Sequence, residues 1–212
     1  MKVAIALGSQ HPRPRARALS IGRKLADDGL IVTACLIDAT SDGPALAARL
    51  GLTKALFVAD AALAKTGSRG RAQALAHLLA GLDLDLVVVD AEDDGGGGIF
   101  SASLAHEGQM NGLFGLDQLE RDGDDSKALI ATLDVGGMRQ RLRVQLPAVV
   151  SIRGESTAAP ETDPELVESH VFCLEDLELA PERLIAEPIP GATFEPTFRR
   201  PQTVANIDDL LR

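Results

Sequence analysis

Short apolar runs alternate with segments of helical period along the first half of the chain. The runs that predict buried strands occupy residues 2–7, 30–37, 56–59 and 84–89. Helical spacing of apolar residues covers residues 15–28, 44–50 and 69–80, and another helix is predicted to begin at Ile99. This alternation predicts a doubly wound, mostly parallel α/β sheet, a fold that binds ligands at the carboxyl ends of its strands.

The pattern changes after the helix at Ile99. In chain order, a bend with a strand is predicted over residues 110–119, two hairpin arms over 129–133 and 140–144, and a further buried strand over 147–152. Gly136 and Gly137 supply the hairpin turn. We expect this antiparallel hairpin to extend the sheet, which would make the core mixed at one edge.

The chain from residue 154 onwards has the composition of an irregular arm. Residues 154–165 and 180–201 are rich in proline, threonine and acidic residues and offer few apolar positions to bury. We therefore divide the chain into a nucleotide-binding-type α/β domain with a hairpin insertion (residues 1–153) and an extended C-terminal arm (154–212). The apolar residues of the arm need a surface, which we expect a partner subunit to supply: Leu174, Leu177, Leu179, Ile207, Leu210 and Leu211.

The most informative stretch joins the strand at 84–89 to the helix at Ile99. It contains Asp93, Asp94, Gly95, Gly96, Gly97 and Gly98. A glycine loop at a helix N-terminus presents unpaired backbone N–H groups and the positive end of the helix macrodipole, and both favour an anion. The run matches neither a dinucleotide fingerprint nor a P-loop. Two interpretations stay open, an ordinary surface turn and a cradle for a phosphate or ribose phosphate.

Composition narrows the classes of partner. The net charge of the 212 residues is −10, which argues against nucleic acid and anionic membranes as partners. No apolar run approaches the roughly 18 residues of a membrane span, and the first residues lead directly into a strand, so we expect a cytoplasmic protein without membrane insertion. Cys35 and Cys173 are far apart in sequence and predict neither a metal site nor a disulfide framework.

Three arginines interrupt the acidic character of the chain near its start. Arg13, Arg15 and Arg17 lie within a short segment after the first strand. They are compatible with bidentate contacts to flavin or nucleotide phosphates and equally with an exposed basic patch. Aromatic residues make up only 3% of the chain, and tryptophan and tyrosine are absent. A platform on which this chain could stack a flavin ring is therefore not expected.

Several stretches together resemble a known family. They are LDLVVVD at 84–90 with the glycine loop that follows, RLRVQLPAVVSI at 141–152, KVAIAL at 2–7 and TVANIDDL at 203–210. The chain resembles the β subunit of electron transfer flavoproteins, in a divergent bacterial form similar to those found beside amine and methylated-glycine oxidation enzymes. In this chain, glycines stand where that family has Asn, Gln and Thr in the loop.

The resemblance implies a non-catalytic subunit. Such a β subunit pairs with an α subunit that holds most of the redox-active FAD, binds a structural AMP itself, and carries electrons from a flavin dehydrogenase or demethylase towards the respiratory chain. Carried over by position, the cofactor-binding residues are Ala6, His11, Arg13, Asp38, Asp93, Asp94, Gly95, Gly96, Gly97, Gly98 and Ser101. The loop N–H groups and the Ser101 hydroxyl would donate to the phosphate.

Two other classes of function are compatible with parts of the sequence. One is a stand-alone module of the same layout that binds an adenine nucleotide. The other is an enzyme acting on a nucleotide with Asp93 or Asp94 as Mg²⁺ ligands. The second ranks last, because no second acidic cluster, no nucleophile with a base and no catalytic lysine accompanies these aspartates.

Overall fold

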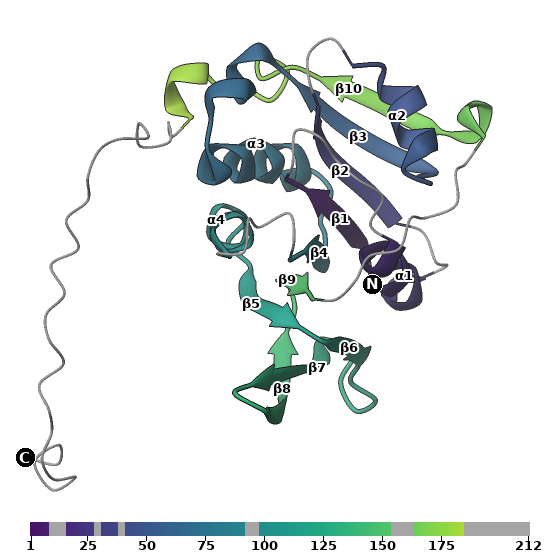
Figure 1. Cartoon of the computed structure of the whole chain (residues 1–212), viewed down its shortest axis with the longest axis vertical. Coiled ribbons are helices and arrows are strands. Elements are labelled where there is room, and N and C mark those ends of the chain that lie inside the picture. Colours follow the sequence, from purple (N-terminus) through teal and green to yellow (C-terminus); the bar gives the residue numbers. More distant parts are fainter. Residues whose placement is uncertain (9–15, 28–30, 38–40, 92–97, 154–162, 185–212) are drawn as a thin grey trace, which may run out of the picture.

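A seven-stranded parallel sheet forms the centre of the molecule (Figure 1). The computed structural model describes residues 1–8, 16–27, 31–37, 41–91, 98–153 and 163–184. The strand order is β10-β3-β2-β1-β4-β9-β5, and each neighbouring pair is parallel. The bounds are β1 Val3–Leu7, β2 Ile31–Ile37, β3 Lys54–Ala59, β4 Leu86–Asp90, β5 Asn111–Leu116, β9 Ala148–Ile152 and β10 Glu168–Phe172. The predicted doubly wound α/β fold is confirmed.

Helices cover both faces of this sheet. One face carries α1 (Ala16–Leu25) and α2 (Gly43–Arg49), and the other carries α3 (Ser68–Ala80) and α4 (Ile99–Glu107) (Figure 1). Because both faces are covered, a central strand such as β1 is buried at every position and reads as a continuous apolar run. None of the helices among the described residues is both long and apolar enough to cross a membrane.

Local sequence signals fix where short helices begin. The Asp42 carboxylate accepts a hydrogen bond from the N–H of Ala45 at 3.2 Å, and Pro44 occupies the first turn of α2. Asp60 accepts from the N–H of Ala62 at 2.8 Å at the start of the 3₁₀ helix η2 (Ala61–Lys65). Two further 3₁₀ helices, η3 (Pro164–Leu166) and η4 (Pro181–Arg183), lie in the C-terminal part.

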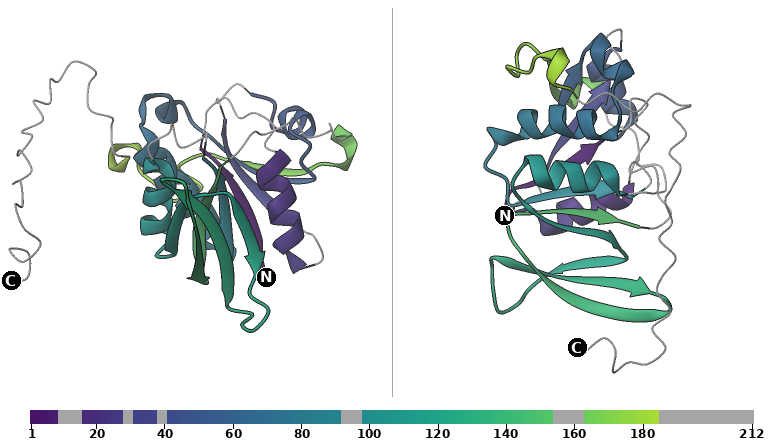
Figure 2. Two further views of the ribbon diagram at one scale, coloured as in Figure 1. Left: turned by 60° about the horizontal axis from the view of Figure 1, so that its bottom comes forward. Right: turned by 90° about the vertical axis from the view of Figure 1, so that its left-hand side faces the viewer.

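The predicted hairpin belongs to a separate small sheet. Strands β6 (Gln118–Arg121), β7 (Ala128–Val135) and β8 (Met138–Gln145) pair antiparallel with one another, and Figure 2 shows them apart from the large sheet. The expectation that the hairpin mixes one edge of the large sheet is therefore wrong. Alternate residues of β7, including Leu129 and Ala131, are buried in the core on the α1 side. The hairpin thus packs as an extra layer, because this arrangement buries its apolar face.

The C-terminal part returns to the large sheet. Residues 168–172, which the sequence placed in the irregular arm, form β10 and pair parallel with β3. Leu174 and Leu179 are buried in the core on the α3 and α4 side, and Leu177 packs against it. These leucines find their surface within this chain and not on a partner as expected. Ile207, Leu210 and Leu211 lie outside the described residues.

Candidate functional site

The strand order creates a crevice at the carboxyl ends of β1 and β4. These two strands are neighbours, and residue Ala6 of β1 pairs with Val89 of β4. The chain continues from β1 to α1 on one face and from β4 to α4 on the other face. This reversal is the topological switch point at which doubly wound sheets bind ligands. The connecting segments 9–15 and 92–97, which follow these strands, lie outside the described residues.

The start of α4 has the features of an anion site. Gly98 has a left-handed backbone (φ 68°), which glycine adopts without strain, and a Cβ built there would meet nothing within 4 Å. The first helical bond runs from the N–H of Ala102 to the Gly98 carbonyl at 3.0 Å. The preceding N–H groups of the first turn have no acceptor within the helix. Since Ile99 is 59% exposed, this helix end opens to solvent and fits a phosphate group.

Phe100 fills the base of the crevice. A Cβ built on Gly8, the residue after β1, would lie 2.6 Å from Cε2 of the Phe100 ring. The ring itself is only 1% exposed. Gly8 therefore lacks a side chain because the ring occupies that space, and a ligand at the switch point must lie further out, beyond Phe100.

Three of the residues carried over from the family lie at this edge of the structure. Gly98 directly precedes α4, whereas Ala6 and Ser101 are fully buried in and beside the core. Ser101 is already engaged in an interaction within the protein, so a phosphate would meet the first-turn N–H groups before its hydroxyl. The other predicted positions lie outside the described residues and stay predictions: His11, Arg13, Asp38, Asp93, Asp94, Gly95, Gly96 and Gly97.

Of the three arginines near the start of the chain, Arg17 lies in the described part. Its guanidinium donates to the backbone carbonyl of Asp117, between β5 and β6. The residue is half-buried, so it joins α1 to this connection instead of belonging to a freely exposed patch. Arg13 and Arg15 lie outside the described residues.

Sequence reasoning missed one further cation at the same edge. Arg153 follows the last residue of β9 and is exposed. The available signal was a single arginine directly after an apolar strand whose carboxyl end was predicted to reach this edge. No role was predicted for Arg153, which is the last residue of the predicted α/β domain.

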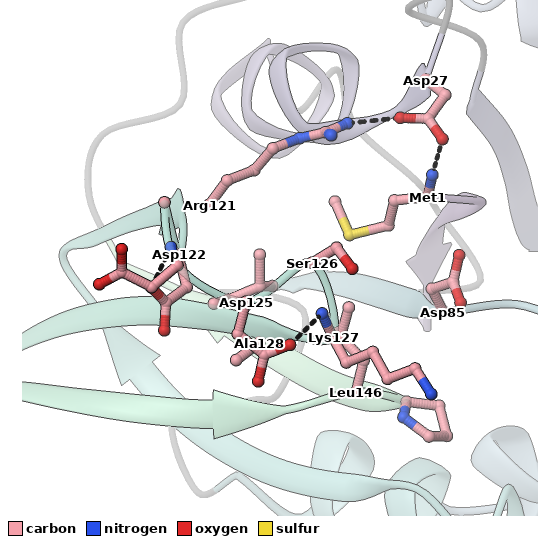
Figure 3. A pocket seen from close by; sticks show the side chains of 14 residues that line it. Met1, Asp27, Asp85, Arg121, Asp122, Asp125, Ser126, Lys127, Ala128 and Leu146 are labelled. Atoms are coloured by element: carbon pink, nitrogen blue, oxygen red, sulfur yellow. Dashed lines mark hydrogen bonds and ion pairs between the residues drawn. The ribbon is translucent and has the colours of Figure 1, made fainter.

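A large pocket lies at the opposite edge of the sheet (Figure 3). It has a volume of about 840 Å³ and is lined by Met1, Asp27, Asp85, Arg121, Pro147 and the 122–129 turn, among others. Several of its acidic groups are partnered within the chain. Asp27 pairs with the Met1 amino group and, at 2.7 Å, with Arg121, and Asp85 accepts from the N–H of Lys2 at 2.7 Å. We therefore assign the candidate site to the switch point, where α/β sheets bind their ligands, and not to this pocket.

Hydrogen bonds lower the pKa of two carboxyl groups in this pocket. The Met1 ammonium, followed by the Arg121 guanidinium, holds the pKa of Asp27 below its usual range. For Asp122, the backbone N–H of Asp124 at 3.0 Å is the main cause, and Arg143 at 2.7 Å adds to it. Hydrogen bonds donated to the ionised carboxylate stabilise it, which is the origin of both shifts.

The lowered pKa of Asp27 predicts a pH-dependent contribution to stability. This contribution is present above the ordinary pKa near 3.8 and is lost as pH falls through the lower folded-state pKa. Asp27→Asn is therefore expected to reduce the melting temperature slightly at pH 7 and to match the wild type in strong acid. Thermal melts between pH 7 and 2 measure this difference.

Asp83→Asn provides the control for this measurement. Asp83 also pairs with a cation, Lys2 at 3.2 Å, but its side chain is 95% exposed. Exposed pairs contribute little to stability, so Asp83→Asn is expected to melt like the wild type at every pH. A deficit of Asp27→Asn that persisted undiminished at the lowest pH would contradict the assignment.

The fold and the crevice together define a class, the doubly wound α/β proteins that bind ligands at the switch point between β1 and β4. A family model described as the electron transfer flavoprotein domain matches residues 10–169. This match covers most of the chain, which therefore belongs to the electron transfer flavoprotein family. A search among curated proteins found no match. Family membership indicates a role in electron transfer and is consistent with FAD as a cofactor.

Proposed function

We propose that the chain is the β subunit of a heterodimeric electron transfer flavoprotein. In this role it carries electrons, together with an FAD-bearing α subunit, from a flavin dehydrogenase or demethylase towards the respiratory chain. It has no catalytic residues of its own and provides a rigid surface on which the FAD-bearing α subunit packs. The family match over residues 10–169 supports the general role, and the β-type stretches at 84–90 and 141–152 support the choice of subunit.

The residues that line the crevice support the assignment of FAD to the α subunit. Its described part offers an anion site at the start of α4 but no accessible aromatic face. Phe100, the ring at its base, is buried against Gly8, and the chain has no tyrosine or tryptophan. A flavin ring held by this chain alone would need such a face or an equivalent apolar seat. The flavin is therefore assigned mainly to the α subunit.

The same helix start is the proposed position of a structural AMP. The left-handed Gly98 and the first-turn N–H groups of α4 would hold its phosphate. The family positions His11, Arg13, Asp38 and 93–97 would supply the remaining contacts. When bound, AMP contributes negative charge and ring surface that order the residues around it, without taking part in electron transfer.

Co-expression tests this proposal directly. The chain produced alone is expected to be colourless, and production with an electron transfer flavoprotein α subunit is expected to give a yellow heterodimer with one FAD. The absorbance spectrum and the mass of the complex measure both points. Denaturation of the purified complex, followed by chromatography of the released nucleotides, is expected to show FAD together with AMP.

The same experiment separates the alternatives. Tight binding of FAD by the isolated chain would contradict the assignment of the flavin to the α subunit. A stable monomer that retains AMP or ATP and does not associate with the α subunit would instead support a stand-alone adenine-nucleotide-binding module.

A further inference from the structure

Arg153 occupies a defined place at the carboxyl edge of the sheet. Its backbone N–H donates to the carbonyl of Leu116 in β5 at 2.7 Å. The preceding residue, Ile152, accepts from the N–H of Ala91 at 3.0 Å, and Ala91 leads into the glycine loop. Arg153 is thus held between the end of β5 and Ala91, the residue that follows β4.

A glycine in β5 makes room for the guanidinium. Gly115 has a φ of +73°, and a Cβ built there would lie 2.9 Å from Nε and 3.0 Å from Nη2 of Arg153. The pairing of β5 with β9 is irregular at this point, and the Gly115 N–H donates to the buried Ser151 hydroxyl at 2.9 Å. The guanidinium therefore lies directly against bare backbone, which restricts its rotamers before any ligand arrives.

The side of the sheet on which Arg153 lies is that of α4. Val149 belongs to the core between the sheet and α3 and α4. Residues two apart in a strand point to the same face, which places Ser151 on this face as well. Its hydroxyl accepts from the N–H of Gly115, the residue against which the Arg153 guanidinium lies. Helix α4 packs against both β5 and β9. The Arg153 cation and the positive end of α4 are therefore on the same face and at the same edge.

A second cation, Arg17, belongs to α1 on the other face of the sheet. Arg17 reaches the carbonyl of Asp117, two residues after Gly115, a separation of about 7 Å in an extended chain. In the part of the chain that the structure describes, no carboxylate forms an ion pair with Arg17 or Arg153. Carboxylates also lie near this edge, at Asp90 in the last position of β4 and at Asp117 after β5, so in a chain of net charge −10 a phosphate there depends on directed donors such as the Arg153 guanidinium more than on net positive potential.

We propose that Arg153 is a preformed contact for a phosphate or pyrophosphate group of a nucleotide. The inference rests on the proposed function, which brings nucleotides to this edge of the sheet. The planar guanidinium can donate two parallel hydrogen bonds to phosphate oxygens, while the α4 N-terminus supplies further donors. The nucleotide has two possible sources with the same chemistry: one bound in the crevice of this chain, and the dinucleotide carried by the α subunit.

The test replaces Arg153 in the full-length chain. Inorganic pyrophosphate and AMP are titrated calorimetrically into the isolated chain, and FAD retention is measured in the heterodimer. Arg153→Gln is expected to weaken at least one of these by about tenfold, the effect of losing a charge-assisted hydrogen bond. Arg139→Gln, at an exposed position in the β7–β8 hairpin, removes the same charge elsewhere and is expected to leave all three unchanged.

Gly115→Ala tests the packing of the Arg153 guanidinium against Gly115 separately from its charge. The added methyl group would displace the guanidinium and strain the backbone, so it is expected to weaken the same ligand as Arg153→Gln although the positive charge remains. Arg153→Lys, which keeps the charge but not the planar fork, is expected to give an intermediate loss. Circular dichroism identifies any variant that fails to fold, and Arg153→Gln, at an exposed position, remains the deciding variant.

Each of the three binding measurements has a defined outcome. Weaker binding of pyrophosphate or AMP by isolated Arg153→Gln assigns the contact to a nucleotide in this chain's own crevice. Loss of FAD from the heterodimer alone assigns it to the dinucleotide of the α subunit. Wild-type behaviour of Arg153→Gln with all three ligands would overturn the inference and leave the proposed function intact. Failure to form any FAD complex would instead reject the proposed function, and the pyrophosphate titration would still decide the role of Arg153.

Discussion

Phe100→Ala is expected to lower the free energy of unfolding by about 3–5 kcal/mol. The ring is 1% exposed and packs with Leu104 and Ala6 in the core between the sheet and α3 and α4. Its far side rests on Gly8, which has no side chain that could fill the space left by truncation. The variant therefore loses apolar burial and keeps most of the cavity. Urea denaturation monitored by circular dichroism measures the change.

The neighbouring residue gives a matched control for this variant. Ile99 lies one position earlier in the same helix but is 59% exposed. Ile99→Ala is expected to change stability by no more than about 0.5 kcal/mol. Equal effects of the two substitutions would contradict the placement of Phe100 at the base of the crevice.

Leu174→Ala is expected to cost about 2–5 kcal/mol in stability. Leu174 follows β10 and is 1% exposed in the same core cluster as Leu63 and Leu75. The side chain therefore contributes as much as a central core residue, although it lies in the part of the chain that the sequence assigned to an arm. Urea denaturation of the full-length variant measures the loss.

An exposed leucine from the same part of the chain provides the comparison. Leu166 in η3 is 71% exposed, so Leu166→Ala is expected to have almost no effect on the urea midpoint. If Leu174→Ala were equally harmless, the residues after β9 would not belong to the folded core.

The strands and helices of the large sheet were predictable because their burial is reflected directly in the sequence. A strand covered on both faces, such as β4, requires apolar residues at nearly every position. Asp42 and Pro44 indicate where the short helix α2 begins. These signals are local, and a single sequence displays them in full.

The placement of the remaining strands depends on neighbours that are distant in sequence. The apolar residues of β7 indicate a buried strand but not which layer covers it, so the hairpin was assigned to the wrong sheet. The strand β10 contains Glu168 and His170 and lies at an edge, where polar residues are tolerated. Its sequence therefore resembles that of an irregular segment.

Of the candidate site, the helix start was predictable from the sequence, whereas contacts between residues distant in the sequence were not. The run of glycines before an apolar segment correctly indicated that a helix begins at Ile99, and the structure adds that Gly98 before it has a left-handed backbone. Two other glycines have roles that only the tertiary structure reveals. Gly8 accommodates the ring of Phe100, and Gly115 accommodates the guanidinium of Arg153. Each partner is remote in the sequence, so no local pattern connects the pair.

The position of β10 beside β3 affects the chain while it is being synthesised. Asp60, just after β3, and Leu174, just after β10, are 114 positions apart, which corresponds to roughly 6–23 s at ribosomal rates of about 5–20 residues per second. During this interval the apolar strand β3 has an open edge, which is a template for pairing with other chains. Among the described residues, β10 is the last strand to leave the ribosome and thus protects the nascent protein from aggregation, and a chain truncated before β10 lacks that protection permanently.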